Sequence, residues 1–123
     1  MSSKIKSKKY KININGKNFN TIDGTPERDF IHITDLCRIH KQTYNYLSMN
    51  NRIILNCGSG VRFSVLEVIR AFEKKIKKKF SISYKIVNLD ETQTICSSIH
   101  LLTKIFKMNI KKRQINYLIK DYY

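Results

Sequence analysis

The sequence has few cysteines, and it has no long apolar run. Its three cysteines, Cys37, Cys57 and Cys96, are odd in number and widely separated, which argues against a disulfide framework and a zinc site. We expect free thiols in a reducing compartment and no bound metal. No run approaches the ~20 apolar residues of a membrane span, and the basic N-terminus lacks the apolar core of a signal peptide. We therefore predict a soluble, cytoplasmic protein.

Acidic residues are also scarce. Nine Asp and Glu residues face 24 Lys and Arg residues, which gives a formal net charge of +15. Such an excess of cations suits binding to polyanions through their phosphates. Lys, Ile and Asn are abundant along the whole chain, however, so a general compositional bias explains the charge equally simply. Both interpretations remain open at this point.

The chain is long enough for one domain. Of its 123 residues, 41% are apolar, which is typical of a folded protein with a modest core. We predict a disordered basic tail over residues 1–10 and a folded domain over 11–123. Alternating residues 11–14, followed by Asn15-Gly16 and residues 17–19, predict a β-hairpin. A loop at Asp23-Gly24 and Pro26 precedes an expected short strand over 30–33.

The remaining pattern alternates helices with strands, which indicates an α/β fold. We expect a helix capped by Thr34 or Asp35, then a buried strand over 53–55. Ser64 to Glu67 forms a capping box, and an apolar stripe predicts a helix through Ile76. Further expected elements are a strand over 81–87, a helix capped by Ser97 or Ser98 that extends to Met108, and a last helix holding Ile115, Leu118 and Ile119.

Arg28 is the first candidate for binding. An arginine carries a permanent charge, and its two-pronged donor geometry matches a phosphate. It lies in a loop just before an expected strand, where a side chain can reach a ligand. The structural alternative is an ion pair with Glu27, Asp29 or Asp35.

Three other features carry weaker signals. Gly58-Ser59-Gly60 follows an expected strand and opens a helix, but Phe63 stands where a dinucleotide loop needs a third glycine. We expect a tight turn there, although amides near Ser64 could face an anion. His32 is more typical of a hydrogen-bonded core residue than of a base. The lysines of residues 74–79 are either a solvated helix end or a phosphate-binding cluster.

Two segments together resemble a known family. They are residues 23–36 (DGTPERDFIHITDL) and residues 56–68 (NCGSGVRFSVLEV). In this order and spacing they are similar to the substrate-binding, C-terminal part of UDP-glucose 4-epimerase, an extended short-chain dehydrogenase/reductase. The resemblance runs from about Ile12 to Asn109. It implies an α/β fragment made of the last strand of the Rossmann sheet plus the small substrate-binding domain, without the N-terminal Rossmann domain that binds NAD.

The resemblance also implies roles for residues. In the family, NAD takes a hydride from C4 of the sugar and returns it to the other face, which interconverts UDP-glucose and UDP-galactose. By motif, Arg28 corresponds to an arginine that binds the pyrophosphate. Phe30 corresponds to an aromatic near the nucleotide, and Val65 to a residue that lines the uridine pocket. We expect no catalytic residue here, and we expect this chain to bind no NAD on its own.

The sequence departs from the family in several places. It contains no glycine-rich NAD fingerprint and no Tyr-x-x-x-Lys pair. A second UDP-binding segment of the family matches residues 89–93, where Asp90 replaces an arginine and Gln93 replaces a ribose-binding aspartate. Ile110 stands at the place of a family tryptophan.

Three functional hypotheses follow from these departures. The first is a UDP-sugar-binding fragment that works with an NAD-binding chain or as a homodimer. The second is a small basic module that binds nucleic acid non-specifically. The third is a non-catalytic subunit that packs on a Rossmann partner.

Overall fold

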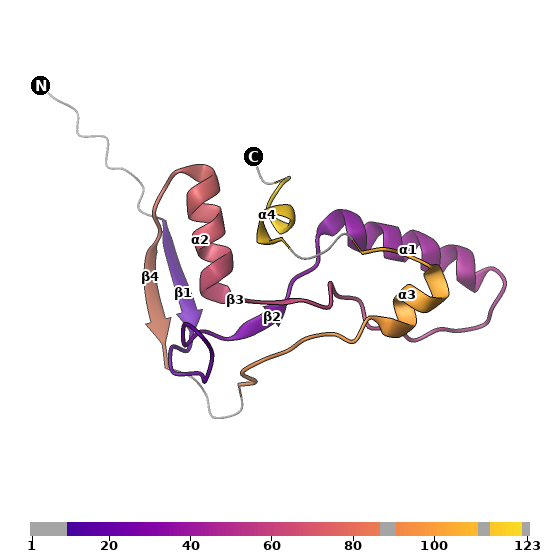
Figure 1. Ribbon diagram of the computed structural model, residues 1–123, viewed down its shortest axis with the longest axis horizontal. Helices are drawn as coiled ribbons and strands as arrows, with labels where there is room; N and C mark the ends of the chain where they lie inside the picture. Colours follow the sequence, from indigo (N-terminus) through magenta and orange to yellow (C-terminus); the bar gives the residue numbers. More distant parts are fainter. Residues whose placement is uncertain (1–9, 87–90, 111–113, 122–123) are drawn as a thin grey trace, which may run out of the picture.

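The computed structural model describes residues 10–86, 91–110 and 114–121, and it confirms an α/β fold (Figure 1). The elements in chain order are β1 (Lys11–Asn15), β2 (Glu27–Asp29), α1 (Ile33–Leu47), β3 (Arg62–Ser64), α2 (Val65–Ile76), β4 (Ser81–Lys85), α3 (His100–Phe106) and α4 (Ile115–Leu118). The expected basic tail, apart from Tyr10, and the expected end of the strand at Val87 lie outside the described residues.

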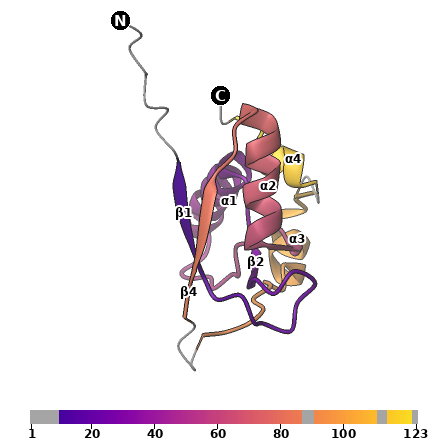
Figure 2. The ribbon, with the colours of Figure 1, turned by 90° about the vertical axis from the view of Figure 1, so that its left-hand side faces the viewer.

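The expected hairpin at residues 11–19 is wrong. Strand β1 pairs in parallel with β4, in a register that runs from Lys11 opposite Ser81 to Asn15 opposite Lys85. Gly16, with φ of 88°, continues this pairing by donating its N–H to the Lys85 carbonyl at 3.1 Å. The pairing leaves Ile14 only 2% exposed. Helix α2 lies along the two strands (Figure 2). A non-local partner therefore overrides the local turn signal.

Strand β2 comes earlier than expected. The extended pairing covers Glu27–Asp29, antiparallel to β3, whereas residues 30–32 have no regular structure and Ile33 already begins α1. Neither Thr34 nor Asp35 caps this helix. The N-cap is His32, whose Nδ1 accepts a hydrogen bond from the Thr34 N–H at 3.1 Å. An unprotonated imidazole nitrogen thus satisfies a helix-start amide, a role usually filled by Ser, Thr, Asp or Asn.

The capping box of α2 is confirmed. The Glu67 N–H donates to Ser64 Oγ at 3.0 Å, and the Ser64 N–H donates to Glu67 Oε2 at 2.7 Å. The apolar stripe of α2 faces inward, and Ile69 is 7% exposed. The helix ends at Lys77, which takes the left-handed conformation with φ of 53°.

A cluster of buried apolar residues lies between α1, α3 and the segment after α3. Its buried members are Ile39, Leu102, Met108 and Ile110, and Ile31, Leu55, Ile99 and Phe106 pack against them. Two expectations are wrong here. Residues 53–55 form no strand, and Ile54 is 89% exposed, because no other strand pairs with this segment within the described residues. Helix α3 has Ile99 at its N-cap position without a side-chain cap, and it ends before Met108.

The last helix is confirmed at Ile115–Leu118, followed by Ile119, which is 3% exposed. Helix α4 lies against α2 in both views (Figures 1 and 2).

Candidate functional site

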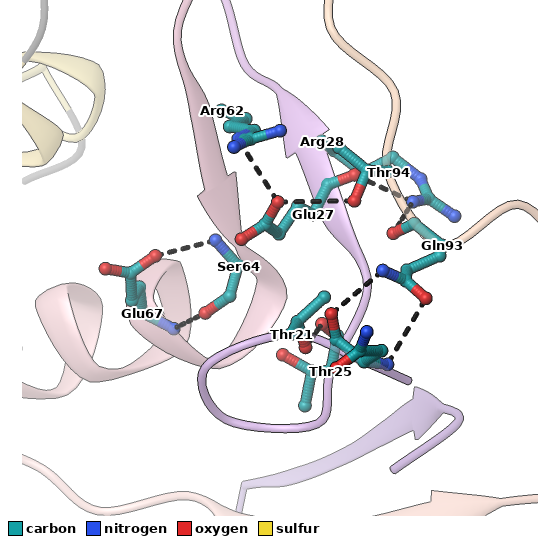
Figure 3. Close-up of polar contacts among 10 residues, drawn as sticks. Thr21, Thr25, Glu27, Arg28, Arg62, Ser64, Glu67, Gln93 and Thr94 are labelled. Atoms are coloured by element: carbon teal, nitrogen blue, oxygen red, sulfur yellow. Dashed lines mark hydrogen bonds and ion pairs between the residues drawn. The ribbon is translucent and has the colours of Figure 1, made fainter. Parts of the chain in front are cut away.

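Arg28 lies in the middle of β2, opposite Phe63 of β3, and is half-buried. Its Nη1 donates to two backbone carbonyl oxygens, that of Glu27 at 2.8 Å and that of Gln93 at 3.2 Å (Figure 3). Within the described part of the chain, no carboxylate lies in ion-pair distance of its guanidinium. The structural alternative of an ion pair with Glu27, Asp29 or Asp35 is therefore wrong. Neutral carbonyls hold the side chain, and no carboxylate of the described residues compensates its charge.

Each of the three acidic residues proposed as partners of Arg28 is bound elsewhere. Glu27 Oε2 lies 3.3 Å from Arg62 Nε and also accepts from Thr94 Oγ1. Asp35 Oδ1 lies 3.2 Å from Nη1 of Arg38, one helical turn later. Asp29 binds the glycine loop and is described below.

Gln93 helps to fix the position of the Arg28 side chain. Its backbone carbonyl accepts the Glu27 N–H at 2.9 Å as well as Arg28 Nη1, so the segment around Thr94 runs beside β2 in parallel. The Gln93 side chain exchanges two hydrogen bonds with the backbone of Asn20, at 3.2 and 2.9 Å. Because both its oxygen and its nitrogen are used in this way, the amide is occupied by the loop after β1. Asp90, the other departure from the family in this segment, lies outside the described residues.

The loop before β2 is fastened to the start of α2 by Asp23 and Thr25. Asp23 Oδ1 accepts from the Thr25 N–H at 2.9 Å and from Thr25 Oγ1 at 2.6 Å, and its Oδ2 accepts from Ser64 Oγ. Burial opposes ionisation of Asp23, but the hydrogen bonds from Ser64 and Thr25 outweigh it and lower the pKa of this carboxyl. Thr25 is 0% exposed. The DGT segment therefore sets the position of β2 relative to α2.

Asp29 explains the glycine loop. Its Oδ1 accepts from the N–H and the Oγ of Ser59, each at 2.7 Å, and its Oδ2 accepts from the N–H groups of Gly60 and Ser97, each at 3.1 Å. A Cβ at Gly58 would lie 2.3 Å from Asp29 Oδ2, so only glycine fits there. The expectation of a tight turn is confirmed, since Gly60 has φ of +70°. The loop amides bind a carboxylate of the same chain.

The amides near Ser64 are not available to an outside anion, contrary to the expectation stated above. The N–H groups of Ser64 and Glu67 are used within the capping box. The Val65 N–H donates to the Pro26 carbonyl at 3.1 Å, and the Leu66 N–H donates to Thr25 Oγ1 at 3.3 Å. These contacts join the helix start to the loop before β2.

The other two predicted site residues lie at opposite ends of β2. Phe30 directly follows the strand, and Val65 is bonded through its backbone to Pro26, which directly precedes it. Both side chains are half-buried. Arg28 lies between these two positions. Sequence reasoning missed the structural roles of Asp29 and Gln93, because their partners lie 30 or more residues away in the chain.

His32 is a buried residue at 2% exposure, as expected. Its Nε2 lies 3.1 Å from Asp121 Oδ2, and its ring packs on Tyr117 with the centroids 4.7 Å apart. These contacts fasten the end of α4 to the start of α1 and leave no path for a base to reach a substrate. Burial, followed by the charge of Asp35, raises the pKa of Tyr117.

The chain offers no metal centre within the described residues, where no group of three His, Cys, Asp or Glu side chains converges. All three cysteines are exposed and unpaired. No helix of the described segments is long and apolar enough to cross a membrane.

Known proteins with a similar fold are nucleotide-sugar enzymes of the extended short-chain dehydrogenase/reductase class. No family model matches the sequence. The UDP-Glc/GlcNAc 4-epimerase of Campylobacter jejuni superposes with a TM-score of 0.76 at 29% identity, covering 92% of this chain and 34% of that one. The UDP-glucose 4-epimerase of Bifidobacterium longum, solved with NAD⁺ and UDP, gives 0.77 at 25% identity, covering 88% and 32%.

The sequence comparison names the same enzyme. The chain is 38% identical over 63 residues to the UDP-glucose 4-epimerase of Bifidobacterium longum, which is 51% of this chain and 18% of that protein. This chain is therefore related to a portion of the UDP-glucose 4-epimerases, and the resemblance inferred from the two motifs is confirmed. It spans about a fifth of the length of the curated relatives that it matches, from 18% to 22%.

Proposed function

We propose that this chain is the UDP-sugar-binding portion of a UDP-glucose 4-epimerase-like protein, and that Arg28 binds the pyrophosphate. The observation that carries the proposal is the state of Arg28: its guanidinium is held by two carbonyls and is not neutralised by any carboxylate of the described residues. A guanidinium in this state is ready for a bidentate contact with an anion. Arg28 also lies in the motif, residues 23–36, whose arginine binds the pyrophosphate in the family.

Phe30 and Val65 complete the proposed site. Phe30 supplies a flat apolar surface beside the nucleotide, and Val65 lines the uridine side. Their positions at the two ends of β2 are consistent with a nucleotide lying along the strand. The Gln93 amide already bonds Asn20 through both its oxygen and its nitrogen and carries no charge, so phosphate contacts carry most of the affinity.

Catalysis requires groups that this sequence does not contain. Without a Tyr-x-x-x-Lys pair or a glycine-rich NAD fingerprint, this chain supplies substrate binding only. In the proposal, NAD and the proton-transferring residues are provided by an N-terminal NAD-binding chain on which this chain packs.

Calorimetric titration of the purified chain with UDP, UDP-glucose and uridine tests the proposal. We expect saturable binding of UDP and UDP-glucose and much weaker binding of uridine, which lacks phosphates. Arg28→Ala should lower the affinity for UDP by roughly 10- to 100-fold, because a hydrogen bond to a charged group is worth about 1.5–3 kcal/mol. Arg52→Ala is the matched control, since it removes an exposed arginine and should leave binding unchanged.

Circular dichroism of each variant shows whether the fold is intact. A folded wild-type chain that does not bind UDP would contradict the proposal, as would equal binding by the wild type and Arg28→Ala.

A further inference from the structure

One end of the molecule carries a dense group of cations. We define this basic end as Arg70, Lys74, Lys75, Lys77, Lys78, Lys79 and Lys120. The first six occupy the last turns of α2 and the residues that follow it, and Lys120 follows α4. Helix α4 lies beside α2 (Figures 1 and 2).

The ion pairs of the described residues offset only part of the charge of the basic end. Glu73 is the only acidic residue between positions 70 and 79, and it is 3% exposed. It already accepts from Arg70 Nη1 at 2.6 Å, from Lys79 Nζ at 3.2 Å and from the Phe80 N–H at 2.8 Å. Among the described residues, no ion pair involves Lys74, Lys77 or Lys78, and all three are exposed.

The packing of α4 adds to this charge and gives it a shape. Lys75 Nζ donates to the carbonyl of Ile119 and, at 2.5 Å, to that of Lys120, which brings Lys120 beside α2. Two hollows result. One of about 350 Å³ is lined by Arg70, Glu73, Lys74, Lys77, Lys78 and Lys79. The other, of about 400 Å³, lies between α2 and α4, and Lys74 lines both. Cations thus line two adjoining hollows, a span suited to successive phosphates of a chain.

Aromatic rings stand at both margins of the basic end. Lys78 Nζ lies 5.5 Å from the centroid of the Tyr10 ring, and Lys120 Nζ lies 4.5 Å from that of Tyr117. Tyr10 is 48% exposed and packs edge-on against Phe80. Tyr117 already packs on His32, so of these two rings Tyr10 is the one open to a base, while the lysines meet phosphates.

We propose that the basic end binds the phosphate backbone of single-stranded nucleic acid without reading its sequence. A lipid surface is the less suitable partner, because this end has few exposed apolar side chains that could add insertion to its attraction for anionic lipid. Within the described residues, none of the large apolar side chains that are exposed lies between positions 70 and 79 or 114 and 121.

The proposal does not depend on UDP binding. Arg28 lies on β2, near the start of α2, whereas the basic end surrounds the end of the same helix. Removing charge from the basic end should therefore leave the titration with UDP unchanged, so that the two proposals can fail separately.

Fluorescence anisotropy with a labelled oligothymidylate, at increasing NaCl concentration, tests the basic end. We compare the wild type with Lys74→Gln/Lys77→Gln/Lys78→Gln and with Lys41→Gln/Arg52→Gln/Lys104→Gln. The second variant is the matched control, because it loses the same charge at exposed positions on α1, after α1 and on α3. Both triple variants are first checked for folding by circular dichroism.

We expect the basic-end variant to bind the oligonucleotide at least 10-fold more weakly than the wild type. The slope of log Kd against log [NaCl] should fall by roughly 2, because each of the three lost phosphate contacts removes about 0.7 from it. The control variant should bind nearly as the wild type does. Equal loss in both variants, or an unchanged slope, would assign the binding to overall charge and overturn the proposal. Tighter binding to phosphatidylserine vesicles than to the oligonucleotide would overturn it as well.

Discussion

At the scale of single residues, Asp29 organises more of the candidate site than any other side chain described above. It lies next to Arg28 in β2 but binds in a different direction, accepting four hydrogen bonds from Ser59, Gly60 and Ser97. Three of these donors are backbone N–H groups, so the carboxylate satisfies amides that the loop itself leaves without partners. Asp29 thereby ties β2 to the glycine loop and to the segment before α3. The position of Arg28 depends on this anchor.

Asp29→Asn should destabilise the protein by about 1–3 kcal/mol. The amide keeps one oxygen and so retains acceptors for only two of the four donors, which leaves partly buried N–H groups unsatisfied. The free energy of unfolding, measured by urea denaturation, checks this expectation. Glu91→Gln removes an equal charge where the described residues form no ion pair, and it should change stability little. Equal stability of Asp29→Asn and the wild type would show that the loop does not need its carboxylate.

At the scale of elements, α2 is fixed at both ends by glutamates. Glu67 closes the capping box at the start. Glu73, in the last turn, accepts the N–H of Phe80 and so fixes the turn between α2 and β4. The hydrogen bond from Arg70, then that from the Phe80 N–H, lowers the pKa of Glu73 to about 2 from its ordinary value of 4.5.

Glu73 predicts a loss of stability in acid. Because its pKa is lower in the folded state, its ionised form stabilises the fold fully above about pH 4.5, and this contribution disappears as the pH falls toward 2. Thermal unfolding, measured from about pH 6 down to about pH 2, should show a falling Tm. Glu73→Gln should flatten that decline, whereas the Glu91→Gln control should keep it. An unchanged pH profile in Glu73→Gln would contradict the assigned role.

At the scale of the whole molecule, the described residues form two small sheets of two strands each and leave several large apolar side chains in solvent. The most exposed are Ile22, Met49, Ile54 and Ile86, at 102%, 87%, 89% and 97%. Exposed apolar groups and open strand edges both favour association with another chain. This arrangement agrees with the proposal that the chain packs on a partner.

We expect the isolated chain to self-associate as its concentration rises, which sedimentation velocity measures directly. Ile54→Lys should reduce association, because residues 53–55 form an apolar run that pairs with no strand among the described residues and a charge opposes edge-to-edge contact. Ile22→Lys, in the loop after β1, is the control and should have a smaller effect. A monomer at all concentrations would contradict the prediction.

The sequence by itself determined the features that rest on neighbouring residues. The capping box of α2 was predictable because Ser64 and Glu67 are three residues apart and satisfy each other's backbone groups. The α/β class followed from the alternation of helical and extended patterns, and the two motifs were sufficient to indicate the family. Arg28 was recognisable as a candidate because its residue type and motif are local properties.

Only the tertiary structure decided which distant groups meet. It paired β1 with β4 rather than with its own hairpin, because a five-residue parallel pairing and the burial of Ile14 outweigh a two-residue turn signal. It used His32 as a helix cap and occupied the glycine-loop amides with Asp29, since the fold places each side chain where backbone N–H groups need an acceptor. It also placed the Gln93 carbonyl, rather than a carboxylate, against Arg28. Hydrogen-bond partners 30 or more residues apart leave no periodic trace in a sequence, so the electrostatic state of Arg28 was set by the folded chain.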